Sequence, residues 1–321
     1  MAKNTWRQLF LAGICCYAFG AVADSGGAPT RIVVASAPGG NLDVLARILA
    51  EKLGATQKRT YIVENRPGAG GNIATAQVAH AKPDGRTLLV VSTSHTSNVH
   101  VYKKVGYDPI KDFTPIAKLA ESAFVVAVPV DSSITSLADL EKAAKARPGS
   151  LNHGSSGIGQ GNHLGMELLK NRLGLKITHV PFTSANALVT ALMGKQVDVA
   201  MLTLPGALMG VRAGKIRLLA VTSQKRVEQL ASVPTVEEKI GGDFVMTSWQ
   251  GLVAPAGLPA KEAADLSKQV ASVMAQPEVV GALDSIALTP QVTSPDAFQQ
   301  FLVKETRRWG DVANQSNIRM D

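Results

Sequence analysis

Three turns rich in glycine and serine are the segments of this sequence best suited to hold a small ligand. They cover residues 38–43, 66–72 and 154–162, and each follows a strand-like run and precedes a helical pattern. Glycine lets the backbone approach a ligand, while free N–H groups and the helix dipole favour an anion such as a carboxylate or phosphate. The turns therefore indicate an anion site, although a glycine at such a place can also serve tight turn geometry alone.

Nucleotide binding is poorly supported by the same residues. Gly157-Ile158-Gly159 resembles part of a dinucleotide fingerprint, but position 162 is Asn, and His179 and Val180 stand where an acidic residue is expected. The phosphate-binding motif G-x-x-x-x-G-K-[ST] does not occur. We therefore expect no nucleotide cofactor.

Catalytic and metal chemistry have no clear motif either. Ser156 and His163 form the best nucleophile and base pair, but no acid is placed to orient the histidine, and the G-x-S-x-G spacing is missing. The six histidines are scattered, with no H-E-x-x-H motif and no cysteine partner. The sequence predicts no catalytic residue, no metal site and no cofactor, which favours a binding protein over an enzyme.

Length and composition indicate what kind of protein carries these turns. At 321 residues, with 45% hydrophobic and 18% charged residues, the chain predicts a globular protein of about two domains. The formal net charge is +8, but Lys and Arg alternate with Asp and Glu along the chain. That pattern indicates a mildly basic surface, and we expect no nucleic-acid partner.

The first residues have the layout of a secretory signal peptide. Lys3 and Arg7 precede an uncharged apolar stretch, residues 9–23, that closes with Ala21-Val22-Ala23. We predict a signal peptide over residues 1–23, cleavage near Ala23 and a periplasmic location; a retained membrane anchor is the alternative. Both cysteines lie inside this segment, so the mature chain depends on its hydrophobic core for stability.

Short β-branched runs alternate with amphipathic segments, the rhythm of βαβ units. Asn41 is the expected N-cap of a helix that ends at Gly54, and Ser136 and Ser294 are expected to begin two others. The strands are predicted at residues 31–35, 61–63, 87–92, 151–155, 177–182, 197–203, 216–222 and 244–253.

The domains are expected to be joined by crossing strands, since no low-complexity linker divides the chain. Residues 122–130 and 244–253 are apolar extended runs without a capping signal and are the expected crossings. We predict one domain from residues 24–124 with 252–321 and another from residues 125–251, with a ligand cleft between them. We expect a monomer.

A series of short motifs, in order over nearly all of the mature chain, resembles one known family. The motifs are Ala37-Pro38-Gly39-Gly40 with Asp43, residues 63–71 (VENRPGAGG), residues 81–85 (AKPDG), Tyr107-Asp108-Pro109, Gly154-Ser155-Ser156-Gly157 with His163-Leu164, and residues 179–182 (HVPF), 194–198 (GKQVD), 220–223 (AVTS), 233–235 (VPT) and 254–257 (APAG). They resemble the periplasmic solute receptors of tripartite tricarboxylate transporters, the Bug or TctC family.

The resemblance implies an α/β, type II-like periplasmic-binding-protein fold, in which each domain is a mostly parallel sheet flanked by helices. The implied function is a receptor that closes on a small organic carboxylate and delivers it to the membrane subunits of the transporter. A ligand sensor for a signalling partner is an alternative, and an enzyme on the same scaffold, with Ser156 as its reactive group, is a weaker one.

The resemblance also implies which residues meet the ligand. In the first domain these are the turn at Pro38, Gly39, Gly40 and Asp43, partly through water, and the polar segment at Ser92, Thr93 and Ser94. Asp43 is expected either to cap its helix or to hold water or a ligand amine. In the second domain the turn at Ser155, Ser156, Gly157 and Gly159 grips the far end, beside Phe182, Ser184 and Thr203.

Three departures from the family pattern put the identity of the acid in question. Thr183-Ser184-Ala185 stands where a Gly-Gly pair is usual, His153 stands where Tyr is common, and Thr203-Leu204 replaces a more polar pair. These changes are consistent with a narrower or less polar cleft.

Overall fold

The structure, a computed structural model, describes residues 28–320, so the predicted signal peptide lies outside the described residues. The strands are β1 (Thr30–Val34), β2 (Tyr61–Asn65), β3 (Thr87–Ser92), β4 (Phe113–Pro129), β5 (Asn152–Ser155), β6 (Thr178–Pro181), β7 (Val199–Thr203), β8 (Ile216–Val221), β9 (Thr247–Pro255) and β10 (Thr289–Pro290). The helices are α1 (Asn41–Gln57), α2 (Asn72–Ala79), α3 (Thr93–Val101), α4 (Leu137–Ala146), α5 (Gly161–Leu173), α6 (Ala185–Met193), α7 (Leu204–Arg212), α8 (Val236–Ile240), α9 (Ala260–Met274), α10 (Pro277–Ser285) and α11 (Pro295–Gln315). Within residues 28–320, no helix combines the length and the apolar character needed to cross a membrane.

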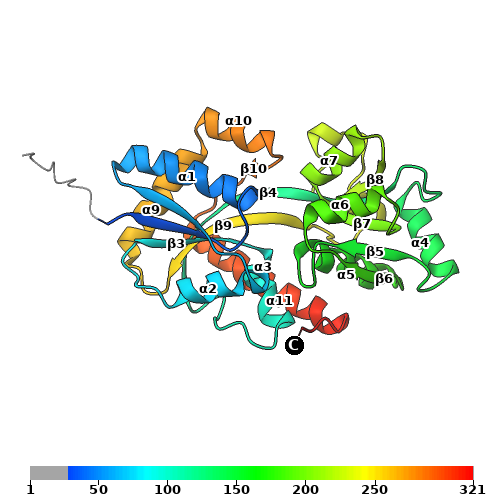
Figure 1. Cartoon of the computed structure of the whole chain (residues 1–321), viewed down its shortest axis with the longest axis horizontal. Coiled ribbons are helices and arrows are strands. Elements are labelled where there is room, and N and C mark those ends of the chain that lie inside the picture. Colours follow the sequence, from blue (N-terminus) through cyan, green and yellow to red (C-terminus); the bar gives the residue numbers. More distant parts are fainter. Residues whose placement is uncertain (1–27, 321) are drawn as a thin grey trace, which may run out of the picture.

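Two halves of the molecule are joined by the long strands β4 and β9 (Figure 1). The first half contains β1, β2 and β3 with α1, α2, α3, α9 and α10, and the second contains β5 to β8 with α4 to α8. Strand β4 pairs with β9 over residues 113–123 and with β7 and β8 over residues 124–129. The change of partner falls at Phe124, which is where the predicted first domain ends.

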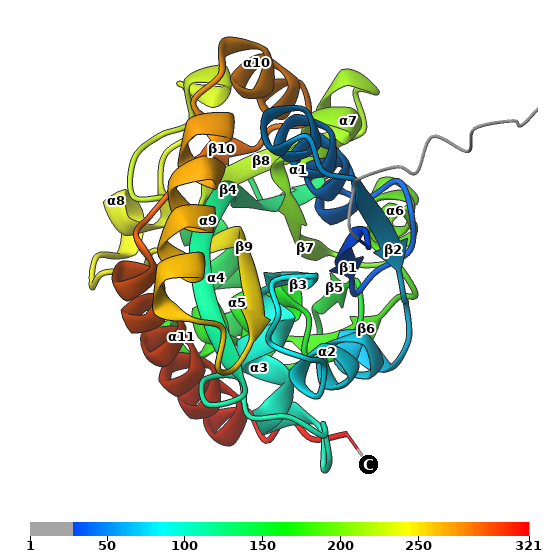
Figure 2. The same cartoon turned by 90° about the vertical axis from the view of Figure 1, so that its left-hand side faces the viewer.

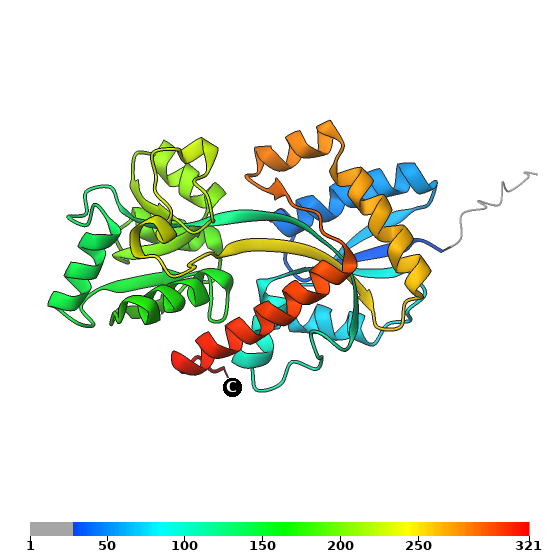
Figure 3. The ribbon, with the colours of Figure 1, turned by 180° about the vertical axis from the view of Figure 1, so that it is seen from behind.

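The parallel ladders of the sheet lie outside the crossing strands. Strand β1 pairs in parallel with β2 and β3, and β5 pairs in parallel with β6 and β7. The crossing strands add antiparallel ladders, because β9 pairs with β3 and β4, and β4 pairs with β7 and β8. The end view in Figure 2 shows the twist that results, and Figure 3 shows α11 lying along the crossing strands.

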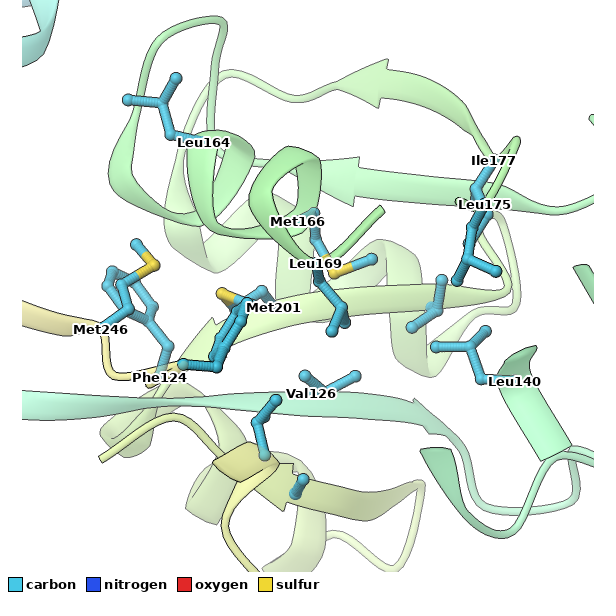
Figure 4. Close-up of a cluster of buried hydrophobic side chains, with 14 of the residues drawn as sticks. Phe124, Val126, Leu140, Leu164, Met166, Leu169, Leu175, Ile177, Met201 and Met246 are labelled. Atoms are coloured by element: carbon cyan, nitrogen blue, oxygen red, sulfur yellow. The ribbon is translucent and has the colours of Figure 1, made fainter. Parts of the chain in front are cut away.

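Each half has its own hydrophobic core. In the second half, Met166 and Leu169 of α5 pack over Met201 of β7 and over Phe124 and Val126 of β4 (Figure 4). The largest cluster of the first half packs α1 and α9 against β1, β3 and β4. Cores on both sides of the crossing strands give each half its own stabilising interior.

Two of the three expected N-cap residues are confirmed by the structure. Ser136 and Ser294 accept hydrogen bonds from the N–H groups of Asp139 and Ala297, as predicted. The prediction for α1 is wrong at both ends: Gly40 is the N-cap instead of Asn41, and the helix passes Gly54. Gly54 is needed for another reason, since a Cβ there would lie 3.1 Å from the Arg59 carbonyl oxygen of the returning chain.

One glycine of a crossing strand gives a direct test of the packing between β9 and α11. A Cβ at Gly251 would lie 2.2 Å from Cζ of Phe298, whose side chain is fully buried. We expect Gly251→Ala to lower the free energy of unfolding by about 2 kcal/mol, because the rigid ring has no free space to enter. Urea unfolding measures this change.

Gly281→Ala is the matched control, since Gly281 lies in α10 and a Cβ added there would meet no atom within 4 Å. Alanine favours a helix over glycine by up to about 1 kcal/mol, so the control is expected to keep or raise stability. Equal unfolding midpoints for the two variants would contradict the proposed steric conflict.

Candidate functional site

A cavity of about 200 Å³ lies where the turns after β1, β2 and β3 meet the start of α5. The carboxyl ends of parallel strands are the usual place for a ligand in an open α/β sheet. Residues of the first half supply all of its lining except Gln160, which comes from the second half. The lining residues are Ala35, Ser36, Leu42, Gly68, Gly70, Gly71, Thr75, Val90, Val91, Ser92, Ser94, His95 and Gln160.

Four helices begin at this cavity. The N-cap residues of α2, α3 and α5 (Gly71, Ser92 and Gln160) line it, and so does Leu42 in the first turn of α1. Within the described residues, none of these helices has a side-chain hydrogen bond at its N-cap, whereas α4, α6, α8 and α11, whose N-caps lie elsewhere, have one. Because α7, α9 and α10 also lack a cap, the distinguishing feature is that four such ends converge on one cavity.

The lining combines apolar side chains with polar groups and carries no formal side-chain charge. Among residues 28–320, no aspartate, glutamate, lysine or arginine lines the cavity, and hydroxyls come from Ser36, Thr75, Ser92 and Ser94. The Ser92 and Ser94 hydroxyls lie 3.3 Å apart. Each uncapped helix end adds about half a positive charge, which at α1 is offset by the Asp43 carboxylate in its first turn. The arrangement suits an anion held by neutral donors.

Asp43 is buried in α1, and hydrogen bonds saturate its carboxylate. Its oxygens accept from the N–H of Gly39 (2.9 Å), from Arg47 Nε (3.1 Å) and from Asn65 Nδ2 (3.0 Å). Burial opposes ionisation, but these bonds outweigh it and hold the pKa of Asp43 below its usual value. The expected capping role is wrong, because α1 has no side-chain hydrogen bond at its N-cap; Asp43 instead fixes the turn at Gly39, and it does not line the cavity.

Comparisons with known proteins show which family the chain belongs to. A family model described as "Tripartite tricarboxylate transporter family receptor" matches residues 45–318. The chain belongs to this family. The family is one of receptors, and the resemblance predicted from the motifs is confirmed.

Among relatives of the receptor is BugT of Bordetella pertussis strain Tohama I, which is 30% identical over 294 residues, or 91% of this chain and 90% of BugT. A solved structure of R. palustris Rpa4515 with adipate is 33% identical, with a TM-score of 0.81 over 91% of this chain and 98% of that one. MatC (Rpa3494) from Rhodopseudomonas palustris with bound malate is 30% identical, with a TM-score of 0.77 over 88% and 98%. These likenesses confirm the predicted α/β fold of periplasmic binding proteins.

The turn at residues 155–159 of the receptor uses its N–H groups internally. Those of Ser156, Gly157 and Gly159 donate to Asn162 Oδ1, Ser155 Oγ and His163 Nδ1. The turn was predicted to grip the ligand directly, but the residue that it presents to the cavity is the next one, Gln160. Ser156 also pairs through its hydroxyl with Asn162 (3.1 Å) and not with His163, the base expected for an enzyme.

Behind this turn three histidines of the receptor are stacked, a cluster not expected from their scattered positions. The ring of His179 lies 3.8 Å from the ring of His163 and 4.8 Å from that of His153, between centroids. Glu167 Oε1 accepts from His153 Nε2 (3.0 Å) and from Lys170 Nζ (2.5 Å). Within the described residues, no group of three His, Cys, Asp or Glu side chains is arranged to hold a metal ion.

Burial makes this histidine cluster neutral. Desolvation, aided by the neighbouring ring, lowers the pKa of His163 to about 3 and that of His179 to about 4. Desolvation also lowers the pKa of His153, although its bond to Glu167 opposes the shift. Burial favours the neutral form of Glu167, but bonds from His153 and Lys170 outweigh it and bring the pKa of Glu167 to about 2.

The remaining predicted site residues of the receptor are dispersed around the cavity. Ser92 and Ser94 line it and Thr93 opens α3, whereas Pro38, Gly39 and Gly40 form the turn between the lining residues Ser36 and Leu42. Phe182 lies beside the 155–159 turn, since its N–H donates to the Ser155 carbonyl oxygen (2.8 Å). Ser184 and Thr203 are the N-caps of α6 and α7, and neither lines the cavity.

Sequence reasoning missed several lining residues. Gly68, Gly70 and Gly71 line the cavity and belong to the turn at residues 66–72, which the sequence indicates as an anion-binding candidate but which the family resemblance does not assign to the ligand. His95 is one of the scattered histidines that no motif singles out; its Nε2 lies 2.9 Å from the Pro109 carbonyl oxygen, and burial lowers its pKa to about 4. Gln160 carried no signal beyond its place at the end of a glycine-rich turn.

A larger cavity of about 1,090 Å³ lies on the other side of the crossing strands, along α11. Acidic and basic side chains line it together, including the pairs Lys118 with Glu121 and Arg308 with Glu305. None of the four helix ends named above lines it. The smaller cavity is therefore the candidate ligand site.

Proposed function

We propose that this receptor works in the periplasm, captures a small organic carboxylate between its two halves and delivers it to a tripartite tricarboxylate-type membrane transporter. It is proposed to act as a monomer with two domains, residues 24–124 with 252–321 and residues 125–251, after removal of residues 1–23. The transporter as partner follows from the family description.

The convergence of four uncapped helix N-termini on a neutral, hydroxyl-lined cavity carries the proposal. An anion gains from N–H donors and helix dipoles there, and no lining aspartate or glutamate among the described residues repels it. Neutral donors suit a receptor that must later release its cargo.

A ligand that touches both halves stabilises the closed form more than the open form. The cavity provides for this, because Ser92 and Ser94 come from one half and Gln160 from the other. Closure about β4 and β9 is the motion that we propose.

The size of the cavity indicates a small acid. Its 200 Å³ lies below the roughly 300–1,000 Å³ of sites for drug-sized ligands. Two similar receptors have structures with adipate and with malate, both dicarboxylates. We propose a mono- or dicarboxylate of that size, bound by Ser92, Ser94, Gln160 and the first-turn N–H groups, with the turn at Pro38, Gly39 and Gly40 closing one side.

Thermal unfolding tests the proposal. The purified receptor, stripped of carried-over ligand by unfolding and refolding, is screened against mono- and dicarboxylates including adipate and malate. A ligand at one hundred times its Kd adds about 2.7 kcal/mol to folding stability, which raises Tm by several degrees. We expect at least one acid to do so, without turnover.

Neutral diamides of the same acids are the matched control, because they keep the shape and remove the charge. They are expected to leave Tm within one degree of the ligand-free value. Equal stabilisation by acid and diamide, or stabilisation by sugars alone, would contradict the carboxylate assignment.

A further inference from the structure

The turn that carries Gln160 to the cavity is hydrogen-bonded to a buried histidine behind it. The N–H of Gly159 donates to His163 Nδ1 at 3.1 Å, and the N–H of Gln160 donates to the Gly157 carbonyl oxygen at 3.3 Å. His163 lies in the first turn of α5 and is 4% exposed, and it does not itself line the cavity. Its ring therefore acts on the cavity only through the turn.

Gly159 is also a point at which the second half touches α3 of the first half. Ser97 Oγ donates to the Gly159 carbonyl oxygen at 3.2 Å, and a Cβ at Gly159 would lie 3.0 Å from Val101 Cγ1. The residue has a φ of +77°, which glycine adopts without strain. A shift of Gly159 would therefore displace both Gln160 and the contact between the halves.

His163 accepts this hydrogen bond only while Nδ1 carries no proton. The titratable groups that face it are His179 of β6, His153 of β5, and Glu167 and Lys170 of its own helix. Glu167 Oε1 lies 3.9 Å from His163 Nε2, and the stacked ring of His179 would repel a second charge. Burial and the His179 ring outweigh the opposing effect of the Glu167 carboxylate and lower the pKa of His163 to about 3, so Nδ1 stays an acceptor from neutral pH down to about pH 4.

We infer that His163 is a positioning residue for ligand capture: through Gly159 it holds Gln160 at the cavity and the 155–160 turn against α3. The inference rests on the proposed carboxylate binding, and it assigns a role to a side chain that touches no ligand. Preorganised donors bind more tightly because less order must be created on binding.

Two substitutions of His163 separate this role from general stability. His163→Leu fills much of the space but has no acceptor for the Gly159 N–H, and it is expected to weaken adipate binding at least tenfold. His163→Asn offers Oδ1 near the place of Nδ1 and is expected to stay within threefold of the wild type. Isothermal titration with adipate measures the affinity of both variants. If the thermal screen identifies a different acid, that acid replaces adipate in the titration.

The Gly159 amide provides a readout that needs no ligand. In ligand-free protein, hydrogen exchange of this amide followed by NMR is expected to be at least tenfold faster in His163→Leu than in the wild type, and close to the wild type in His163→Asn. His163→Ala serves as a second variant without an acceptor should the leucine protein fail to fold.

Unchanged protection of the Gly159 amide in the variants without an acceptor would overturn the inference, and so would failure of asparagine to restore protection. A wild-type protein that bound no acid would count against the proposed function alone, since the amide result still decides the role of His163. Loss of affinity with an intact Gly159 bond would assign the effect of His163 to another contact.

Discussion

Replacement of Ser92 by aspartate is expected to weaken carboxylate binding by about a hundredfold or more while the receptor stays folded. Ser92 is the N-cap of α3, lines the cavity and makes no capping bond. Two carboxylate charges about 5 Å apart repel by about 3 kcal/mol at an effective dielectric constant of about 20, which corresponds to more than a hundredfold in affinity. The new side chain would occupy the helix end that the ligand is proposed to use.

The same aspartate is expected to stabilise the ligand-free protein. A carboxylate at an N-cap accepts from first-turn N–H groups and favours the positive helix end, which is worth about 1 kcal/mol. Loss of binding together with an unchanged or higher Tm would separate the electrostatic effect from unfolding. Isothermal titration and thermal unfolding of the same preparation give both quantities.

Ser92→Asn is the matched control, because asparagine has nearly the shape of aspartate and caps a helix without charge. It is expected to bind the acid within about tenfold of the wild type. Binding of similar strength by the aspartate and asparagine variants would place the ligand away from α3 and would remove the central support for the proposed function.

Most strands and several helix ends of the receptor could be predicted because their signals are local, but residues 113–121 of β4 and the short strand β10 were not expected. The strand at residues 87–92 was predicted with its observed limits, since Leu88 to Val91 form a buried apolar run between polar residues. Ser136 and Ser294 were predicted as N-caps because a short hydroxyl side chain just before an amphipathic segment can accept a hydrogen bond from a first-turn N–H of the same helix. The end of α1 was predicted wrongly because Gly54 does not end the helix: a glycine is needed there because the returning chain at Arg59 passes too close for a Cβ.

Helix α3 could not be predicted, because its sequence TSHTSNVHV has neither helical periodicity nor strong helix formers. Contacts with distant residues hold it in place. Asn98 Nδ2 donates to Asn72 Oδ1 (2.7 Å) and to the Gly70 carbonyl oxygen (3.0 Å), and Ser97 bonds to Gly159. Tertiary structure therefore overrides propensity at the element that brings Ser92, Ser94 and His95 to the cavity.

The chemistry proposed for the candidate site can be predicted from the sequence, but its geometry cannot. Glycine-rich turns before helices indicate an anion, and of the polar segment at residues 92–94, Ser92 and Ser94 line the cavity. Which donors face the cavity depends on side chains that compete for the same N–H groups, as His163 does at Gly159. The stack behind the turn depends on strand register, because β5 and β6 pair His153 directly with His179.

Acidification from pH 7.5 to pH 5 is expected to lower the free energy of unfolding by about 4 kcal/mol through the buried histidines. Burial holds the pKa of His95 near 4 and that of His163 near 3, against 6.5 for a histidine in the unfolded chain. Below pH 6.5 the unfolded chain takes up protons that the folded protein does not, so stability present above pH 6.5 is lost as the pH falls towards the folded values.

The size of the effect follows from 1.36 kcal/mol for each pH unit and each such group. At pH 5 this gives about 2 kcal/mol each for His95 and His163, and less for His179, whose partial exposure lets solvent screen its charge. Glu167, with a pKa of about 2 against 4.5, adds stability that is lost only below about pH 4.5. The loss of about 4 kcal/mol from His95 and His163 together is a large part of the 5–15 kcal/mol that typically stabilises a protein.

Urea unfolding at pH 7.5 and pH 5 measures the difference, and His163→Asn is expected to reduce it by about 2 kcal/mol because asparagine does not titrate. His80→Asn, which removes an exposed histidine, is the control and is expected to keep the whole difference. Equal stability at the two pH values, or an unchanged difference in His163→Asn, would mean that the cluster takes up protons while folded. The Gly159 N–H would then lose its acceptor in mild acid, and the 155–160 turn would be free to rearrange at a pH where the fold itself persists.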